Sequence, residues 1–422
     1  MSKQLTDQDI RDEVKKQLLS NVVTGYSKHF KTEYCTLQPS PDTYPFQYFW
    51  DSCFHIFILT AVGEHLLATR IIRSLFSMQK DNGFVGHILF WGRLRPAKLT
   101  DIFQNHLSES FRPHMSALIQ PPLAAQALER IYYHTKDKKL LEEMVPKLKK
   151  YYDWLGHNRD LDGDGLLSIV TMFETGMDWK PTMDSLVGHS GKSSRSLFWR
   201  GVFVDFRNFS RGYDIKKIHK ANKFLLKEVA FNTIYAQNLA ALSELCTQIG
   251  DKQASKYKRL SDKVSASIMS KMYDSGAVAF WDIKAGSNEP IKVLTPTIFF
   301  PMVLPIVTKQ MAQELIKRHL NNKQEFDTNY PIPSVAINEA SFNQFESEFL
   351  WRGPTWVLYN WFVYQCLFCK GFKKEAKVLS DSIRALINKS GLREYYNPLT
   401  GEGYGAKHFT WSGVVVDMLN LK

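Results

Sequence analysis

Residues 227–246 read KEVAFNTIYAQNLAALSELC, and this stretch decides the fold class. Six of its apolar side chains recur at spacings of three and four: Phe231, Ile234, Tyr235, Leu239, Leu242 and Leu245. Residues at these spacings share one face of an α-helix, so the stretch predicts a helix with a buried side. Strand-like alternation is scarce elsewhere, apart from short pieces such as Ala277–Trp281, which suit small hairpins. We therefore expect an all-α protein.

The same helical spacing continues on both sides of this stretch. It predicts further helices at about 7–24, 51–63, 65–79, 115–134, 138–157, 252–273, 295–306, 308–319, 353–370, 373–390 and 407–420. Helices in six consecutive pairs predict an (α/α)6 toroid, whereas an open solenoid would show a repeat of fixed period, and none is visible. We expect a single domain over 1–422, with long connections at about 80–114, 159–226, 274–294 and 321–352 on one face, where function usually lies.

The net charge of +12 invites comparison with nucleic-acid-binding proteins. The excess is mostly lysine, spread over helix-like segments such as Lys147–Lys150 and Lys216–Lys223, without an arginine-rich stripe. A solvated, lysine-rich surface is the better interpretation. We therefore expect no nucleic-acid partner.

The N-terminal residues and the cysteines indicate where in the cell the protein is located. The first residues, MSKQLTDQDIRDEVKK, lack an apolar signal core, and no apolar run approaches about 18 residues. With five cysteines, an odd number, we expect a cytoplasmic protein with reduced thiols and no membrane partner. Cys366 and Cys369 form a CxxC pair with no second Cys or His pair nearby, so a shared buried helix face is favoured over a metal.

One carboxylate motif lies at a predicted helix start. Residues 44–55 read YPFQYFWDSCFH and place Trp50 beside Asp51. Asp51 or Ser52 would serve as a simple helix cap. Alternatively, the tryptophan ring and the carboxylate suit a sugar pocket, because the ring stacks on the sugar and the carboxylate accepts from its hydroxyls.

A second motif, FETGMDWKP at 173–181, carries Glu174 and Asp178 one helical turn apart. The two form either a plain surface pair or part of a site. A carboxyl beside Met177 and Trp179 would be partly desolvated, which raises its pKa and keeps the proton that a general acid needs.

Two further motifs lie near the C-terminus. Residues 351–356, WRGPTW, open a helix with proline in its first turn, and Arg352 could hold a carboxylate at two points. Residues 394–405, EYYNPLTGEGYG, form a glycine-rich loop with two carboxylates, Glu394 and Glu402, and lead through HFTWS into the last helix.

Together these motifs resemble glycoside hydrolase family 63, in which WDS, ETGMD, WRGPTW and EYYNPLTGEGYG…HFTWS-like segments occur in this order. The resemblance runs from about residue 44 to 415 and is most similar to the mannosylglycerate and glucosylglycerate hydrolase branch. It implies an (α/α)6 barrel that hydrolyses an α-glycosidic bond with inversion of configuration. The runner-up activity within the family is an α-glucosidase acting on an oligosaccharide.

The resemblance also implies a site. It places the general acid at Asp178 and the general base at Glu394, with Glu402 as the competing base. An inverting enzyme needs about 6.5–9.5 Å between the two carboxyls to admit a water. The candidate substrate-binding residues from these motifs are Tyr44, Gln47, Trp50, Asp51, Gln120, Glu174, Trp179, Trp351, Arg352, Trp356, His408 and Trp411.

Arg207 and Tyr213, in the connection after Asp178, are spaced like the glycerate-binding pair of this branch. A planar guanidinium binds a carboxylate at two points. The alternative for Arg207 is a surface charge in a basic protein. The resemblance thus implies mannosylglycerate or glucosylglycerate as the small-molecule sugar substrate.

A metal site and two other function classes are the alternatives. Asp160, Asp162 and Asp164 begin like an EF-hand calcium loop, but Thr171 stands where the bidentate glutamate belongs. We expect no cofactor, with a structural Ca²⁺ at these aspartates as the alternative. The other classes are a non-catalytic carbohydrate-binding toroid and a nucleic-acid-binding solenoid, and the presence of both carboxylates favours the enzyme.

Overall fold

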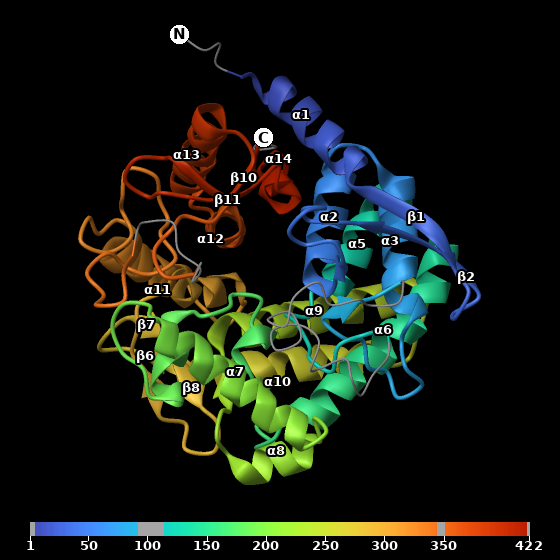
Figure 1. Cartoon of the computed structure of the whole chain (residues 1–422), viewed down its shortest axis with the longest axis horizontal. Coiled ribbons are helices and arrows are strands. Elements are labelled where there is room, and N and C mark those ends of the chain that lie inside the picture. Colours follow the sequence, from blue (N-terminus) through green and yellow to red (C-terminus); the bar gives the residue numbers. More distant parts are fainter. Residues whose placement is uncertain (1–4, 92–113, 344–350, 420–422) are drawn as a thin grey trace.

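The computed structural model describes residues 5–91, 114–343 and 351–419. Helices dominate these ranges (Figure 1), so the prediction of a predominantly helical protein is confirmed. The predicted connections at 80–114 and 321–352 include residues 92–113 and 344–350, which lie outside the described residues.

Six helical elements form an inner layer in which each contacts the next. They are α2 (Phe49–Ala61), α5 (Ala124–Thr135), α9 (Val229–Gln248), the 3-10 helix η5 (Pro296–Val303), α12 (Val357–Cys369) and the 3-10 helix η7 (Thr410–Val414). The last element, η7, contacts α2, so the series of contacts closes on itself. Inner helices are apolar nearly all round because they have neighbours on every side; all residues from Phe49 to Thr60 in α2 are buried.

Outer helices pack against this layer. They are α1 (Asp7–Ser20) against η7, α3 (His65–Ser77) against α2, α6 (Lys138–Arg159) against α5, α10 (Ala254–Met272) against α9, α11 (Lys309–Leu315) against η5 and α13 (Lys373–Ser390) against α12. They bury one face only: α13 buries Leu379, Ile383 and Leu386, which recur at the three- and four-residue spacing of a helix. Near the ends of the chain, α1 contacts α14 (Val415–Met418).

Two helices differ from the sequence prediction at their ends. The helix predicted at 115–134 begins only at Ala124, because Pro121 and Pro122 interrupt it. The helix predicted at 7–24 ends at Ser20, and an antiparallel hairpin follows it. This hairpin consists of β1 (Val22–Ser27) and β2 (Thr32–Leu37) and packs on α3.

Residues 159–226 were predicted as a long connection without helices. This prediction is wrong, because the segment contains α7 (Arg195–Ser210) and α8 (Ile215–Ala221). The sequence pattern missed α7 because its outward face is also apolar: Trp199, Phe203 and Phe206 are all exposed. Periodicity alone cannot separate two apolar faces of one helix.

Short antiparallel strands connect the helices. The hairpin predicted at Ala277–Trp281 is confirmed by the pairing of β6 (Tyr273–Asp274) with β7 (Ala279–Phe280). Three pairings bear on the site: β3 (Gln47–Tyr48) with β4 (Ile88–Leu89), β5 (Leu226–Lys227) with β8 (Asp282–Lys284), and β10 (Arg393–Tyr396) with β11 (Gly403–Lys407).

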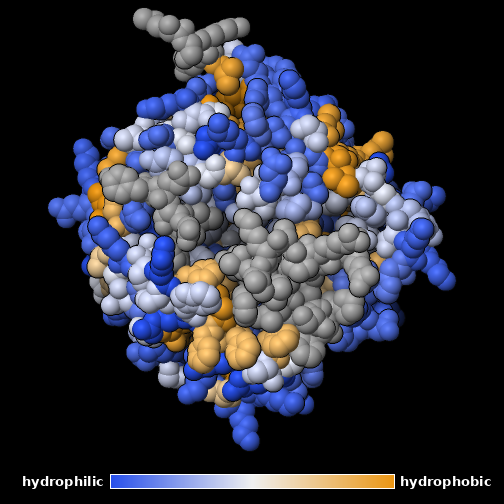
Figure 2. All heavy atoms as spheres, viewed as in Figure 1, coloured by the Kyte–Doolittle hydropathy of each residue, from blue (hydrophilic) through white to orange (hydrophobic). Residues whose placement is uncertain are grey.

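The outer face drawn in Figure 2 is mostly hydrophilic, with a small group of apolar side chains below its centre. Among the helices that the structure describes, none combines the length and the apolar character needed to cross a bilayer. The five cysteines are free thiols, and Cys366 is buried as predicted, whereas Cys369 is exposed at the end of α12.

Candidate active site

The candidate carboxylates lie at the N-terminal ends of inner elements or in segments beside them. Asp51 is in the first turn of α2. Asp178 follows the 3-10 turn η3 (Met172–Glu174), in the loop that precedes η4 (Pro181–Val187). Glu394 belongs to β10. The elements come from distant parts of the chain, and the closed layer of helices brings them together.

The charges of Asp178 and Glu394 both reach Asp51, which indicates that the three carboxyls lie near one another. Burial raises the pKa of Asp51 to about 8, with further contributions from the charges of Asp178 and Glu394. The pKa of the Tyr44 hydroxyl is also raised, first by burial, then by Glu394, and more weakly by Asp178. Because both carboxylates act on both groups, the candidate acid and base belong to the same polar site.

Asp178 has the properties of a carboxyl that keeps its proton. Its side chain is half-buried, and burial alone raises its pKa to about 7. An aspartic acid with this pKa is largely protonated in mildly acidic solution, whereas an ordinary one is ionised.

Glu394 is held as an acceptor. Its Oε1 accepts a hydrogen bond of 2.9 Å from the Tyr44 hydroxyl, and its Oε2 accepts one of 2.8 Å from the Ala406 amide. Hydrogen bonds to a carboxylate favour its ionised form. Gly405 makes this approach possible, because a Cβ there would lie 2.5 Å from Glu394 Oε2 and its φ of +65° suits glycine.

The helix-cap alternative for Asp51 and Ser52 is wrong. The N-cap residue of α2 is Tyr48, and its side chain makes no capping hydrogen bond. Ser52 Oγ donates instead to the Tyr48 carbonyl. Asp51 is 5% exposed and is not the N-cap residue, and the charges of Asp178 and Glu394 both raise the pKa of its carboxyl, which indicates that it lies near them.

Four predicted tryptophans form one cluster beside these carboxylates. Trp351 and Trp356 stack with ring centroids 3.8 Å apart, and Trp411 packs edge-on against both and against Trp50. All four are buried, with 1% to 7% of their surface exposed. The stack covers one face of Trp351 and one of Trp356, so these rings build the wall of the site more than they offer open stacking platforms.

Two glutamines complete this region. Gln120 Oε1 accepts from the Trp50 amide at 3.1 Å and fixes the start of α2. Gln47 Oε1 accepts from Trp91 Nε1 at 2.8 Å, while its buried Nε2 has no hydrogen-bond partner among the described residues. A buried donor without a partner is uncommon, so Gln47 suits a role in binding a polar ligand.

Comparison with known proteins agrees with this geometry. The family model described as the mannosylglycerate hydrolase MGH1-like glycoside hydrolase domain matches residues 44–412. This chain belongs to the mannosylglycerate hydrolase branch of glycoside hydrolase family 63. It is therefore a glycoside hydrolase.

Mannosylglycerate hydrolases are similar to this chain over nearly its whole length. The mannosylglycerate hydrolase of Rubrobacter radiotolerans is 26% identical over 90% of this chain and 91% of its own length. A mannosylglycerate hydrolase of Thermus thermophilus is 27% identical over 89% of this chain and 94% of its own length. The crystal structure of the family 63 mannosylglycerate hydrolase from another strain of Thermus thermophilus, in complex with Tris, has a TM-score of 0.83, with 25% identity over 98% of this chain and 100% of that one.

Glu174 is not available to a substrate of this family 63 hydrolase. Its carboxylate forms a buried ion pair with Arg159, with contacts of 2.5 and 2.7 Å, and also accepts from the Ile119 and Val170 amides. These four hydrogen bonds occupy the acceptor capacity of a carboxylate. Both the predicted substrate contact and the alternative of a surface pair with Asp178 are therefore corrected: Glu174 fixes the loop from inside.

Arg352 binds a carboxylate bidentately, as the sequence suggested, but that carboxylate is Asp184. Its Nη1 and Nη2 lie 2.9 and 2.7 Å from the two Asp184 oxygens, and Nη1 also donates to the Trp179 carbonyl at 3.1 Å. The guanidinium is 1% exposed and engaged within the protein. Arg352 thus fastens the Asp178 loop and does not offer a free charge to substrate.

Trp179 is also used for packing. It stacks on Phe198 of α7, with ring centroids 5.9 Å apart, and is 8% exposed. A Cβ on Gly201 would lie 2.6 Å from its ring, so α7 presses directly on it. The predicted substrate contact of Trp179 is not supported by these contacts.

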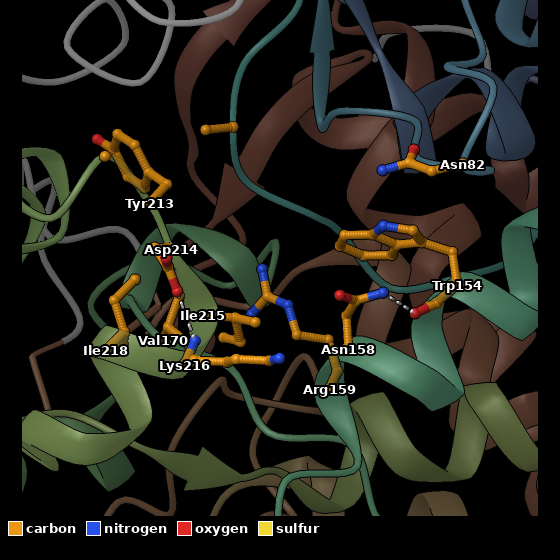
Figure 3. A pocket seen from close by; sticks show the side chains of 12 residues that line it. Asn82, Trp154, Asn158, Arg159, Val170, Tyr213, Asp214, Ile215, Lys216 and Ile218 are labelled. Atoms are coloured by element: carbon orange, nitrogen blue, oxygen red, sulfur yellow. Dashed lines mark hydrogen bonds between the residues drawn. The ribbon is translucent and has the colours of Figure 1, made fainter.

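Arg207 and Tyr213 do not form a joint carboxylate site in this conformation. The Tyr213 hydroxyl donates to Asp205 Oδ1 at 2.9 Å, and its ring lines a hollow of about 390 Å³ opposite Trp154 and Asn82 (Figure 3). Arg207 stacks its guanidinium on Phe203, 4.3 Å from the ring centroid, and lines a different, much smaller hollow. The two side chains diverge because α7 ends between them.

The β10–β11 hairpin separates two further candidates from the shared site. Glu402 is exposed in the turn, where Tyr404 donates to its Oε2 at 3.2 Å. His408 is exposed just beyond β11. Glu394 is buried and bonded to Tyr44, whereas Glu402 is exposed, and this contrast favours Glu394 as the candidate base.

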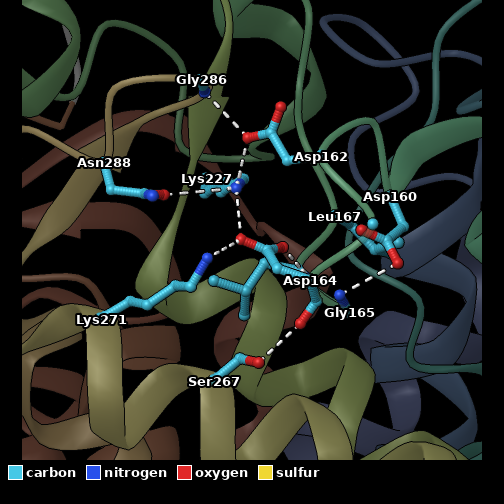
Figure 4. A network of polar contacts seen from close by, with 12 residues as sticks. Asp160, Asp162, Asp164, Gly165, Leu167, Lys227, Ser267, Lys271, Gly286 and Asn288 are labelled. Atoms are coloured by element: carbon cyan, nitrogen blue, oxygen red, sulfur yellow. Dashed lines mark hydrogen bonds and ion pairs between the residues drawn. The ribbon is translucent and has the colours of Figure 1, made fainter.

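The calcium-like loop is neutralised by lysines. Lys227 Nζ lies 2.5 Å from Asp162 Oδ2 and 2.7 Å from Asp164 Oδ2, and Lys271 Nζ lies 2.5 Å from Asp164 Oδ2 (Figure 4). Within the described ranges, no three side chains of the His, Cys, Asp or Glu type gather as a metal site would require. A Ca²⁺ ion here would have to displace a fully buried ammonium group.

We expect neither Ca²⁺ nor a chelator to change the melting temperature or the hydrolysis rate, because Lys227 already compensates the loop aspartates. Differential scanning fluorimetry and rate measurements with excess Ca²⁺ or EDTA check this. A rise in melting temperature that saturates with Ca²⁺ would show that the loop binds the ion.

Two residues of the site region were missed by the sequence analysis. Tyr48 belongs to it, because Asp51 and Asp178 both raise the pKa of its hydroxyl after burial does. Its position three residues before Asp51 was the available signal. Lys180 was missed because its partners, Glu228 and Asp282, lie 48 and 102 residues away. No local pattern reveals such distant pairs.

Proposed function

We propose that this hydrolase cleaves an α-glycosidic bond with inversion, with Asp178 as general acid and Glu394 as general base. The observation that carries the proposal is that Glu394 accepts a hydrogen bond from Tyr44, while the charges of Asp178 and Glu394 both raise the pKa of Tyr44 and of Asp51, which indicates that the four groups lie near one another. Cleavage needs a proton on the leaving oxygen and a water on the opposite face of the anomeric carbon.

The two carboxyls have environments suited to opposite tasks. Burial raises the pKa of Asp178 to about 7, which keeps a proton available for the leaving oxygen. Glu394 accepts hydrogen bonds from Tyr44 and the Ala406 amide, which favours the ionised form that deprotonates water. Two carboxyl groups whose environments differ in this way are the pattern by which an acid and a base are assigned.

Asp51 has a third role in this proposal. With a pKa of about 8 it is mostly neutral at pH 7, so it both donates and accepts hydrogen bonds. A neutral carboxyl near Asp178 and Glu394 binds a sugar hydroxyl without adding a third negative charge. The buried amide nitrogen of Gln47 is a further donor for the sugar.

The architecture we propose is an (α/α)6 toroid forming a single catalytic domain over 1–422. The closed series of contacts from α2 through α5, α9, η5 and α12 to η7 supports it. The outer helices that pack on these inner elements supply the second member of each pair.

The proposed substrate is mannosylglycerate or glucosylglycerate. Support comes from the family and from the mannosylglycerate hydrolases that the chain resembles over nearly their full length. The geometry of Arg207 and Tyr213 does not identify the group that binds the glycerate carboxylate. An α-glucosidase acting on an oligosaccharide is the second candidate, and a preference for neutral oligosaccharides over both glycerate glycosides would establish it.

We further propose that the reaction needs no cofactor and takes place in the cytoplasm. All five cysteines are unpaired thiols, which suits a reducing compartment.

We expect proton NMR of the wild-type reaction to show the β-anomer of the free sugar first, before mutarotation. An α-glycoside gives the β-sugar when water attacks from the face opposite the leaving group. Mannosylglycerate and glucosylglycerate should each be tried, with an α-linked disaccharide as comparison. An initial α-anomer would mean retention and would contradict the assignment of Glu394 as a base.

A further inference from the structure

Lys180 lies two residues after Asp178 and is completely buried. Its ammonium group donates to the Glu228 carboxylate and, at 2.9 Å, to Asp282 Oδ2. Burial lowers the pKa of Lys180, but the attraction of Asp282 and Glu228 outweighs burial and raises it overall. The charge is therefore retained, and this loop carries a buried cation bound to two buried carboxylates.

The two carboxylates are fixed to the inner layer of helices. Glu228 is the N-cap residue of α9. Asp282 belongs to β8, and its Oδ1 accepts a hydrogen bond of 2.7 Å from the amide of Val229, the first residue of α9. Through Lys180, the loop that carries Asp178 is therefore attached to the N-terminal end of an inner helix.

The backbone between the anchor and the carboxyl is short and constrained. The Lys180 amide donates to the Met177 carbonyl at 3.2 Å, closing a turn around Asp178. Trp179, the residue between them, has a φ of +65°, a region that side-chain-bearing residues seldom adopt. Thr175 Oγ1 accepts from the Met177 amide at 2.7 Å and fixes the other end of the turn. A shift of Lys180 is thus transmitted directly to Asp178.

We propose that Lys180 is a positioning residue for catalysis: by binding Glu228 and Asp282 it holds the Asp178 carboxyl where it can protonate the leaving oxygen. The inference rests on the proposed role of Asp178 as general acid. Lys180 is enclosed with its own partners and does not contact substrate. Displacement of a catalytic group by about 1 Å can lower a rate by about 10²-fold.

The test compares two substrates that differ in their need for an acid. The better of mannosylglycerate and glucosylglycerate has a poor leaving group that must be protonated. The matching α-glycosyl fluoride loses fluoride with little protonation. We expect Lys180→Met to lower kcat on the glycerate substrate by about 10²-fold. On the fluoride the loss should stay below roughly 5-fold, since general acid catalysis contributes little there. KM should change little on either.

Lys227→Met is the matched control. Lys227 is also fully buried, and its ammonium binds two carboxylates, Asp162 and Asp164. It precedes Glu228, but successive side chains in extended backbone point to opposite sides, so it serves the aspartate loop and not the Asp178 loop. We expect Lys227→Met to lower the melting temperature about as much as Lys180→Met does. The ratio of kcat on the glycerate substrate to kcat on the glycosyl fluoride should stay at the wild-type value.

Two further variants separate the possible failures. Asp178→Asn must itself show the selective loss on the glycerate substrate; without it, the acid assignment fails and the inference with it. If Asp178→Asn is selective but Lys180→Met lowers both rates equally, only the positioning role is overturned. Should Lys180→Met not fold, Glu228→Gln takes its place, because it keeps the shape of the side chain but removes the charge that binds Lys180. We expect Glu228→Gln to lower the rate several-fold on the glycerate substrate but not on the fluoride. An equal loss of rate on both substrates would again overturn the proposal.

Discussion

Replacement of Asp178 by asparagine is expected to lower kcat on mannosylglycerate or glucosylglycerate by about 10²–10⁴-fold, the usual contribution of a general acid. Asparagine has the shape of protonated aspartic acid but cannot give up a proton. The same change should slow an α-glycosyl fluoride far less, because fluoride departs without an acid.

The pH dependence follows from the raised pKa of Asp178. The acid form persists up to a pH of about 7, so the wild-type rate on the glycerate substrate should fall as pH rises through this value. In the unfolded chain this carboxyl ionises near pH 4, so its ionisation in the folded protein is unfavourable, and the free energy of unfolding should decrease from about pH 4 to 7. Asp178→Asn should remove the fall in rate and the part of the stability loss that Asp178 causes, while Asp51, whose pKa is also raised, still contributes a decrease over the same range.

Urea unfolding at pH 5 and pH 8, together with rate–pH profiles, checks these statements. Asparagine should preserve the fold at pH 5 and should not destabilise it at pH 8. A variant that retains near-normal turnover of the glycerate substrate would show that Asp178 is not the acid.

Glu394→Gln is expected to lower kcat by about 10²–10⁴-fold on both the glycerate substrate and the glycosyl fluoride. A base is needed to activate water whatever the leaving group is, so this loss should not depend on the leaving group. Glutamine still accepts the Tyr44 hydroxyl bond but cannot take a proton from water. Azide needs no deprotonation, and we expect it to restore turnover and give a β-glycosyl azide.

Glu402→Gln is the matched control for this variant, because Glu402 lies in the same hairpin but is exposed. It should retain nearly the wild-type rate on both substrates. A larger loss of rate with Glu402→Gln than with Glu394→Gln would show that Glu402, and not Glu394, is the general base.

The sequence predicted the helices whose apolar residues lie on one side, and also the order of the motifs. Helix α10 and helix α13 fall within a few residues of their predicted bounds because each has a single buried face. The start of α5 was placed too early because a periodic pattern does not register Pro121 and Pro122. Helix α7 was missed because both of its faces are apolar.

For the candidate site, the sequence indicated Asp51, Asp178 and Glu394 because each is a carboxyl among aromatics, and their roles stay predictions that the variants above test. The prediction was poorer for residues whose ion-pair partners are far away in the sequence. Glu174 and Arg352 read as site residues, but their charges are used by Arg159 and Asp184 inside the protein. Such ion pairs join residues that only the folded chain brings together, so spacing in the sequence does not reveal them.

The closed ring of inner elements has a consequence for synthesis on the ribosome. The hydrogen bond between Tyr44 and Glu394 joins residues 350 positions apart, and that between His55 and Thr410 joins residues 355 apart. A nascent chain therefore carries the proposed acid, Asp178, and most of its helices long before the proposed base, Glu394, is synthesised. Until β10 and η7 emerge, the apolar side of α2 that η7 covers has no neighbour, and such surfaces are what chaperones bind. We expect the growing polypeptide to be catalytically silent until the segment that contains β10 and η7 has been made and η7 has docked against α2.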